Sequence, residues 1–191
     1  MRLRAATPDD AAAIADIYAP FVTGSAVSFE TEPPGEPAMR ARIESGGPYP
    51  WLVGESEDGS LIGYAYAARF RDRPAYRFAV ETSVYLRSGA AGRGFGRQLY
   101  EPLLAMLEAQ GFTQAIAAVT LPNEASLRLH ERLGFERAGT YRQVGWKFGA
   151  WHDVGLWQRP LARAGTPPTE PVAGARHAGL DPEPMNTDAG D

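Results

Sequence analysis

The stretch SVYLRSGAAGRGFGR, residues 83–97, decides the fold of this chain. It opens with strand formers, continues with glycines at positions 89, 92, 94 and 96, and leads into an apolar pattern that predicts a helix. Glycines let a backbone approach a ligand closely and present several N–H groups together, and a helix N-terminus adds partial positive charge. With Arg93 and Arg97 beside it, this strand–loop–helix unit predicts a phosphate or pyrophosphate site.

Two common nucleotide-binding motifs do not fit the loop. A P-loop needs Lys followed by Ser or Thr after its second glycine, and the loop has neither. A dinucleotide fingerprint needs G-x-G-x-x-G and an acidic residue after the next strand, whereas this chain has G-x-G-x-G and then Thr120-Leu121-Pro122. Two interpretations remain open. The loop is either a pyrophosphate cradle of the kind that binds coenzyme A or a flexible surface loop.

Outward from this unit, the chain alternates predicted strands and helices. Before the glycine loop we expect strands at 3–6, 51–56, 61–70 and 79–86 and helices at 8–21 and 37–45. After it we expect helices at 94–110 and 123–133 and strands at 115–119, 137–144 and 153–161. This order predicts a single α/β domain with a mixed sheet.

Composition and charge exclude several classes of protein. The net charge of −4 gives no reason to expect binding to nucleic acid or to an anionic membrane. The chain has no cysteine, which excludes disulfides, thiolate metal sites and a cysteine nucleophile. No apolar run approaches the roughly 20 residues that span a bilayer, and the N-terminus does not read as a signal peptide, so we expect a cytoplasmic protein.

The composition changes near Ala162. Residues 162–191 are rich in Pro, Gly and Ala and lack aromatic residues, so they cannot bury enough apolar surface to offset the cost of ordering the chain. We therefore expect one folded domain at 1–161 and a disordered, acidic tail at 162–191.

Together with its neighbours, the glycine loop resembles the GNAT acetyltransferase superfamily, whose pyrophosphate arm reads Q/R-x-x-G-x-G/A. Residues 91–96 match its glycines, while Ala91 stands where the family has Gln or Arg. Other stretches resemble, in the same order, phosphinothricin N-acetyltransferases and related methionine sulfone or sulfoximine acetyltransferases. These stretches are SFETEP (28–33), YPWLV (49–53), VETSVY (80–85), LPNE (121–124), HERLGF (130–135) and KFGAWHDV (147–154).

The resemblance implies a single-domain GNAT fold, with a mixed, mostly antiparallel central sheet flanked by helices and splayed at the strand that receives acetyl-CoA. It implies an N-acetyltransferase that moves acetyl from acetyl-CoA to the primary amine of a small amino acid, needs no metal and forms a homodimer. The cofactor contacts that it implies lie at the end of one strand, around the glycine loop and at the start of a later helix: Val84, Tyr85, Leu86, Gly92, Arg93, Gly94, Phe95, Gly96, Arg97, Asn123 and Ser126.

Glu81 is the candidate general base. A protonated amine is not a nucleophile, so some group must accept its proton. Glu81 lies within an otherwise apolar predicted strand, where partial burial raises the pKa of a carboxyl group and makes it a better base, and the resemblance puts the family's proposed base at this position. The alternative is a strand glutamate that is salt-bridged or faces solvent.

A second catalytic residue would protonate the leaving thiolate. Many GNAT enzymes place a tyrosine on the helix that follows the capping asparagine, and here that helix carries His130, whose ordinary pKa suits proton exchange. Tyr100, on the preceding helix, is another candidate. Local packing would also explain either residue.

The segment RFRDRPAYR, residues 69–77, predicts the class of substrate. Guanidinium groups pair bidentately with carboxylate or phosphinate oxygens, although a solvated hairpin would also carry such charges. The resemblance places substrate contacts at Arg71, Arg73 and Tyr76. We expect Phe29 and Thr31 to form another wall of the pocket. Lys147 and the aromatic residues Trp146, Phe148 and Trp151 could close it, although such aromatic residues more often belong to a core.

Two other functions remain open from the sequence. A protein or peptide N-acetyltransferase could use the same fold, but it would favour an acidic groove over this arginine-rich segment. A non-catalytic acyl-CoA-binding sensor would keep the glycine loop without needing Glu81.

Overall fold

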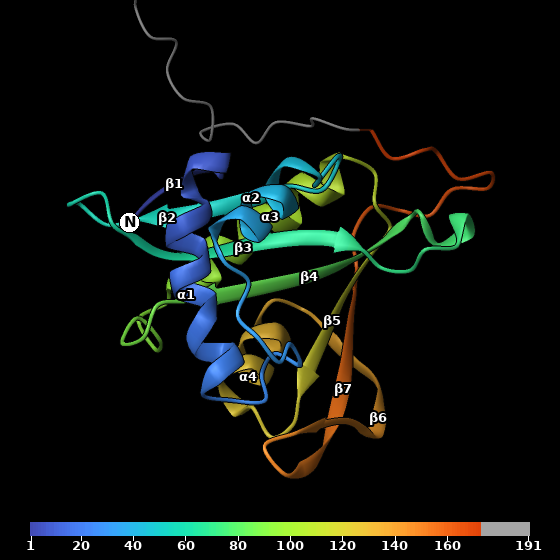
Figure 1. Ribbon diagram of the computed structural model, residues 1–191. Helices are drawn as coiled ribbons and strands as arrows, with labels where there is room; N and C mark the ends of the chain where they lie inside the picture. Colours follow the sequence, from blue (N-terminus) through green and yellow to red (C-terminus); the bar gives the residue numbers. More distant parts are fainter. Residues whose placement is uncertain (173–191) are drawn as a thin grey trace, which may run out of the picture.

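The computed structural model describes residues 1–172, and Figure 1 shows an open sheet with helices packed on its faces. The seven strands lie in the order β1-β2-β3-β4-β5-β7-β6, and β4–β5 is the parallel pair in an otherwise antiparallel sheet. The strands are β1 (Arg2–Ala5), β2 (Trp51–Glu55), β3 (Leu61–Arg69), β4 (Ala79–Leu86), β5 (Gln114–Thr120), β6 (Glu136–Lys147) and β7 (Ala150–Pro160). The helices are α1 (Ala11–Thr23), α2 (Glu36–Glu44), α3 (Phe95–Ala109) and α4 (Glu124–Arg132). The predicted α/β class and the mostly antiparallel sheet are confirmed.

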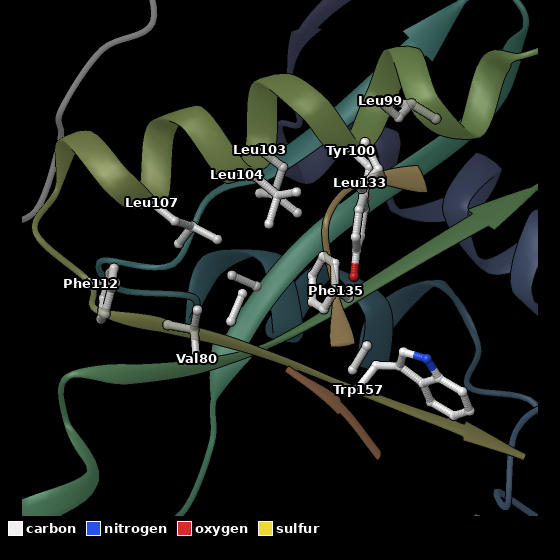
Figure 2. Close-up of a cluster of buried hydrophobic side chains, with 14 of the residues drawn as sticks. Val80, Leu99, Tyr100, Leu103, Leu104, Leu107, Phe112, Leu133, Phe135 and Trp157 are labelled. Carbon is white, nitrogen blue, oxygen red and sulfur yellow. The ribbon is translucent and has the colours of Figure 1, made fainter. Parts of the chain in front are cut away.

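Two apolar clusters hold the helices to the sheet. Helix α3 buries Leu99, Leu103 and Leu107, spaced one helical turn apart, against β2, β3 and β4. Figure 2 shows this cluster, with the Tyr100 hydroxyl directed from α3 towards the strands. A separate cluster joins α1 and α2 to β2 and β3, with Ile14 and Met39 among its fully buried residues.

The helix expected at 8–21 begins with a 3₁₀ turn and continues as α1, Ala11–Thr23. Thr7 and Asp10 form a capping box around the 3₁₀ turn Pro8–Asp10 that leads into α1. Arg4 of β1 donates to both oxygens of the Asp10 carboxylate, at 2.7 Å each. The helix is thereby fixed to the edge strand from which it departs.

The sheet splits between β4 and β5. These strands pair over Ala79–Glu81 and Gln114–Ile116 and then separate. Beyond that point β4 continues along β3 while β5 continues along β7, so each strand follows a different neighbour. Figure 1 shows the two strands starting together and diverging. The predicted splay at the cofactor strand is confirmed, and it creates the space in which the functional residues gather.

The last two strands are longer than the sequence predicted. Strands were expected at 137–144 and 153–161, but β6 and β7 form a hairpin that closes with Lys147 opposite Ala150. The two-residue loop, Phe148-Gly149, has positive φ at both positions (51° and 72°), which matches the twist of an antiparallel hairpin. Irregular register near Gly139 and near Gly145 interrupts the alternation that would reveal the full strands.

Residues 162–172, the described part of the predicted tail, form no helix or strand. They lie against the domain at three points: the Ala162 N–H donates to the Phe112 carbonyl at 3.0 Å, Arg77 donates to Glu170 at 2.7 Å, and the Val172 N–H donates to the Gln110 carbonyl at 2.8 Å. Residues 173–191 of the predicted tail lie outside the described residues. Within the described part of the chain, no helix is both long and apolar enough to cross a membrane.

Candidate functional site

The split between β4 and β5 opens a cleft with about 390 Å³ of empty space, part of which is open to solvent. Its walls come from both diverging strands, from α4 and from the segment that follows α1. The lining residues are Val27, Thr82, Ser83, Val84, Tyr85, Ala117, Ala118, Val119, Thr120, Asn123, Ser126 and His130. A sheet with all its strands paired would have no such opening, because neighbouring backbones would fill it.

Glu81 stands at the vertex of this cleft. It is the last residue of β4 that pairs with β5, where it lies opposite Ile116. Side chains alternate along a strand, Tyr85 packs on Tyr18 of α1, and Thr82 bonds to Tyr100 of α3. Glu81 therefore lies on the same face of the sheet as α1.

The environment of Glu81 favours its neutral form more than water does. Burial raises the pKa of this carboxyl group, and Arg71, whose guanidinium lies 4.0 Å from Oε2, partly opposes the rise. The Glu81 side chain keeps 37% of its exposure, so a small molecule can still reach it. The sequence predicted partial burial and did not identify Arg71 as its charged neighbour.

Val84, Tyr85 and Leu86 lie past the last residue of β4 that pairs with β5. Each still pairs with β3, opposite Ala65, Tyr64 and Gly63 respectively. The edge of β4 that faces the cleft therefore offers backbone groups that β5 does not occupy. The Tyr85 ring packs edge-on against Tyr18 at 5.0 Å, and the Tyr85 backbone pairs with Tyr64 of β3. The Arg87 N–H donates to Ile62 of β3, so by alternation Val84 and Leu86 are the residues whose backbone groups point away from β3 towards the cleft.

The glycine loop joins the open end of β4 to α3. Gly89, Gly92 and Gly94 have φ of 80°, 78° and 82°, values that glycine adopts without steric cost. Gly94 is the N-cap of α3, and the first N–H groups of a helix have no partner within the helix. The loop thus presents a helix N-terminus and a sharply curved backbone next to the cleft, as a phosphate cradle requires.

The other predicted loop residues have distinct surroundings. Gly96 is buried, and a Cβ built on it would lie 3.2 Å from Leu129, so this glycine allows α3 and α4 to approach each other. Arg93 and Arg97 are exposed; the Arg93 guanidinium lies 4.9 Å from the centre of the Phe95 ring, and Arg97 donates to Glu101 at 2.7 Å. Both cations remain within reach of solution beside the loop.

Asn123 and Ser126 shape the opposite wall of the cleft. The Asn123 side chain accepts a hydrogen bond from the Ser126 N–H at 3.1 Å, which confirms the predicted cap of α4. The Ser126 carbonyl in turn accepts from His130 Nδ1 at 2.8 Å. This bond fixes a proton on Nδ1 and orients the imidazole ring.

His130 and Tyr100, predicted as alternatives, lie together in the structure. Nε2 of His130 is 3.2 Å from the Tyr100 hydroxyl, which donates to Thr82 at 2.6 Å. Burial lowers the pKa of His130, and the bond to the Ser126 carbonyl partly opposes this effect. Burial also raises the pKa of Tyr100. Thr82 and His130 line the cleft, so a continuous hydrogen-bonded chain meets it at both ends.

The segment between α1 and α2 contributes Val27 to the lining of the cleft. Phe29 and Thr31, predicted to form a pocket wall, are both exposed on this segment. Tyr18 is hydrogen bonded to Ser28 at 2.6 Å and donates to Glu30 at 3.0 Å, while Arg42 of α2 donates to both Glu30 carboxylate oxygens. This network was not predicted from the sequence, because the network joins residues from two helices and a loop.

The arginine-rich segment connects β3 and β4 near Glu81. Arg71 and Arg73 are exposed, and Tyr76, which keeps 44% of its exposure, packs on Phe70 at a ring distance of 5.7 Å. Arg71 reaches towards Glu81, whereas Arg73 precedes the 3₁₀ turn Pro74–Tyr76. Arg77 pairs with Glu170, whereas Arg71 pairs with Glu81.

Known proteins with similar sequences are acetyltransferases. The family model of an acetyltransferase (GNAT) domain matches residues 3–156. A phosphinothricin N-acetyltransferase of Streptomyces viridochromogenes is 42% identical over 174 residues, which cover 90% of this chain and 94% of that protein. An L-methionine sulfoximine/L-methionine sulfone acetyltransferase of Pseudomonas paraeruginosa is 42% identical over 121 residues, which cover 63% of this chain and 69% of that protein.

A solved structure is similar over nearly the whole chain. It is a GNAT superfamily phosphinothricin acetyltransferase from Sinorhizobium meliloti in complex with acetyl-CoA, with 39% identity and a TM-score of 0.81 over 93% of this chain and 96% of that one. Within residues 1–172, no group of three or more His, Asp or Glu side chains could hold a metal ion.

Proposed function

The chain belongs to the GNAT acetyltransferase family, and from this premise we propose that it moves an acetyl group from acetyl-CoA to the primary amine of a small amino acid of the phosphinothricin, methionine sulfone or methionine sulfoximine type. As a member of this family it is an acetyl-CoA-dependent acetyltransferase. The observation that carries the finer proposal is the position of Glu81, at the point where β4 and β5 separate and 4.0 Å from the guanidinium of Arg71.

The residues around the cleft fit acetyl-CoA. A curved glycine loop at the N-terminus of α3 suits a diphosphate, and the unpaired edge of β4 suits an extended amide-containing arm, which can hydrogen bond as a strand would. Gly92, Gly94 and the N–H groups of residues 95–97 would hold the diphosphate, with Arg93 and Arg97 adding charge. Asn123 and Ser126 would line the other side of the arm. When bound, acetyl-CoA supplies a thioester carbonyl that an amine can attack.

Glu81 acts in this proposal as the general base. Its carboxylate accepts a proton from the ammonium group of the acceptor, which leaves a neutral amine able to attack the carbonyl. Partial burial supports the role, because a raised pKa brings the carboxyl group closer to the pKa of its proton donor. The backbone N–H groups of Val84 and Leu86, which point away from β3, would stabilise negative charge that develops on the carbonyl oxygen.

His130 acts as the proton donor to the departing thiolate, with Tyr100 as its hydrogen-bonded partner. A protonated His130 would donate from Nδ1 to the Ser126 carbonyl and from Nε2 to the Tyr100 oxygen. Burial opposes that state, so the imidazolium is ready to lose its proton. The chain of hydrogen bonds through Tyr100 to Thr82 gives the proton a path along the cleft wall.

The acceptor amino acid enters from the α1 side. Arg71 and Arg73 bind its carboxylate or its second oxygen-bearing group, since guanidinium pairs with both in a fixed geometry. Phe29, Thr31 and Tyr76 provide the remaining walls. The names of the two relatives support this class of acceptor.

We also propose that the chain forms a homodimer through the hairpin of β6 and β7. This hairpin includes β6, the edge strand of the sheet, and carries a cluster of large apolar residues that keep about half or more of their exposure: Tyr141, Val144, Trp146, Phe148 and Trp151. Such a concentration is typical of a surface that is covered in the assembled protein.

The acceptor class is tested by measuring release of free CoA from acetyl-CoA with a panel of amines. The panel contains phosphinothricin, methionine sulfone, methionine sulfoximine, ordinary amino acids and short peptides. We expect turnover with the first three to exceed turnover with any peptide. Acetylation of peptides without acetylation of these amino acids would overturn the proposed acceptor class.

A further inference from the structure

Lys147 is the sole lysine in the 191-residue chain, and the structure buries it. It is the last residue of β6 and keeps 8% of its exposure. Its ammonium group donates to the backbone carbonyls of Val22 and Ser28, at 2.6 Å each. An ammonium ion is strongly hydrated, so it is withdrawn from water without a large cost only where strong acceptors replace that water.

The two acceptors belong to different parts of the α1 layer. Val22 lies in the last turn of α1, where helix carbonyls lack a partner within the helix and a cation is favoured. Ser28 lies in the segment 24–35, next to Val27, which lines the cleft. Helix α1 packs on β3 and β4, whereas β6 lies on the other side of the split, beyond β5 and β7. Lys147 therefore joins the two halves of the divided sheet across the α1 side of the cleft.

The segment 24–35 is held from the opposite side as well. Tyr18 bonds to Ser28 and Glu30, and Arg42 bonds to Glu30. Phe29 lies between these attachments, and its ring packs over Gly145 of β6, where any added Cβ would overlap it. Within the described part of the chain, the hydrogen bonds of Lys147 are the ones that tie this segment to β6. Without them, Ser28 and Phe29 would be held by hydrogen bonds to α1 and α2 alone.

We propose that Lys147 is a positioning residue for the acceptor pocket. Its buried ammonium group holds the segment 24–35 in place and so fixes Phe29 on the face of the sheet that carries Glu81 and α1. The inference rests on the proposed function for its kinetic consequences. Lys147 acts through Ser28 and Phe29 and does not touch the acceptor itself.

Steady-state kinetics of Lys147→Met provide the first test. We expect the acceptor KM to rise about tenfold or more with kcat changed less, because acceptor binding is lost more than transition-state stabilisation, and the KM for acetyl-CoA to stay within about twofold. Lys147→Arg, which keeps a charged donor, should recover part of the loss. An acceptor KM that stays at the wild-type value in a folded Lys147→Met protein would overturn the proposal.

Arg159→Met is the matched control. Arg159 of β7 also reaches from a strand to a carbonyl at the end of a helix, donating to Leu133 at 2.7 Å after α4. Both variants should lower the unfolding midpoint, since each leaves a helix-end carbonyl without its donor. The acceptor KM should rise in Lys147→Met alone. Equal rises in the two variants would show that general destabilisation causes the effect.

A double-mutant cycle with Phe29→Ala separates positioning from direct contact. If Lys147 acts through Phe29, the double variant should have an acceptor KM close to that of the worse single variant. If the two effects multiply, Lys147 contributes independently of Phe29, and the proposal is wrong.

Hydrogen exchange tests the tether without any reaction. Backbone amides of residues 24–31 should exchange faster in Lys147→Met than in the wild type or in Arg159→Met, because the segment opens more often. Unchanged exchange in this segment would overturn the tether itself. Faster exchange in a protein that acetylates none of the amino acids would instead uphold the tether and reject the proposed function.

Discussion

At the scale of single residues, the charge on Arg71 should set the pH range in which Glu81 can act as the proposed general base. Glu81 must be ionised to accept a proton, so kcat/KM should fall as the pH drops through its raised pKa. Arg71→Ala removes the neighbouring cation that lowers this pKa, so the acidic limb of the kcat/KM profile should move to higher pH. The measurement is kcat/KM for the acceptor as a function of pH.

Arg73→Ala is the control for this shift. Arg73 lies in the same exposed segment and has the same charge, but it is not among the groups that move the pKa of Glu81. Both variants should raise the acceptor KM if both bind the substrate, and the limb should move in Arg71→Ala alone. An unmoved limb in Arg71→Ala would argue against Glu81 as the group that titrates.

His130 makes a separate prediction about stability and pH. Burial holds its pKa in the folded protein below the ordinary value of 6.5. As the pH falls below that value, the unfolded chain binds a proton that the folded chain resists, so the free energy of unfolding decreases. His130→Gln should lose this contribution, and its thermal midpoint should fall less than that of the wild type between about pH 7.5 and pH 5.5. A parallel fall in both proteins would contradict the assigned burial effect.

Single residues also show where sequence reasoning stops. Glu81 was identifiable because a carboxyl group inside an apolar strand is unusual. The pairing of His130 with Tyr100 was not identifiable, since the residues lie on different helices and meet only after α3 and α4 pack together. The burial of Lys147 was also missed, because its acceptors are backbone carbonyls more than 100 positions away in the sequence.

At the scale of elements, the glycine loop offers a matched pair of substitutions. Gly92 and Gly89 have similar positive φ, 78° and 80°, and a Cβ added to either would meet no neighbour within 4 Å. Alanine at either position should therefore cost similar stability, about 1–2 kcal/mol, through backbone strain alone. Because Gly92 belongs to the proposed diphosphate cradle, Gly92→Ala should also weaken acetyl-CoA binding measured by calorimetry, whereas Gly89→Ala should not. Equal dissociation constants in the two variants would contradict the assigned cradle.

The elements themselves were predictable where local signals are strong. The caps at Thr7 and Asn123 and the glycines after β4 determine boundaries that the structure reproduces closely. The hairpin of β6 and β7 was predicted too short because its loop places Phe148, an aromatic residue, at positive φ, which a reading of turn residues does not anticipate. Strand pairing on both sides of that loop supplies the compensating stability.

At the scale of the whole molecule, the exposed aromatic residues of β6 and β7 predict a dimer. Trp146, which keeps 60% of its exposure in the single chain, lies within this cluster. Trp146→Glu would place a charge in the proposed interface and should convert the protein to a monomer in sedimentation-velocity experiments. Val172→Glu changes a similarly exposed residue outside the cluster and should leave the mass unchanged. A wild-type monomer at micromolar concentration would contradict the proposed assembly.

The whole molecule is arranged, in the function that we propose, so that Glu81 takes a proton from the acceptor while the cleft holds acetyl-CoA. Glu81→Gln keeps the size and hydrogen-bonding reach of the side chain but removes the base. Turnover of phosphinothricin and binding of acetyl-CoA should be measured for this variant beside the wild type. We expect kcat to fall about 100-fold or more, with the dissociation constant of acetyl-CoA within about twofold of the wild-type value. Wild-type turnover in Glu81→Gln would show that Glu81 is not the base.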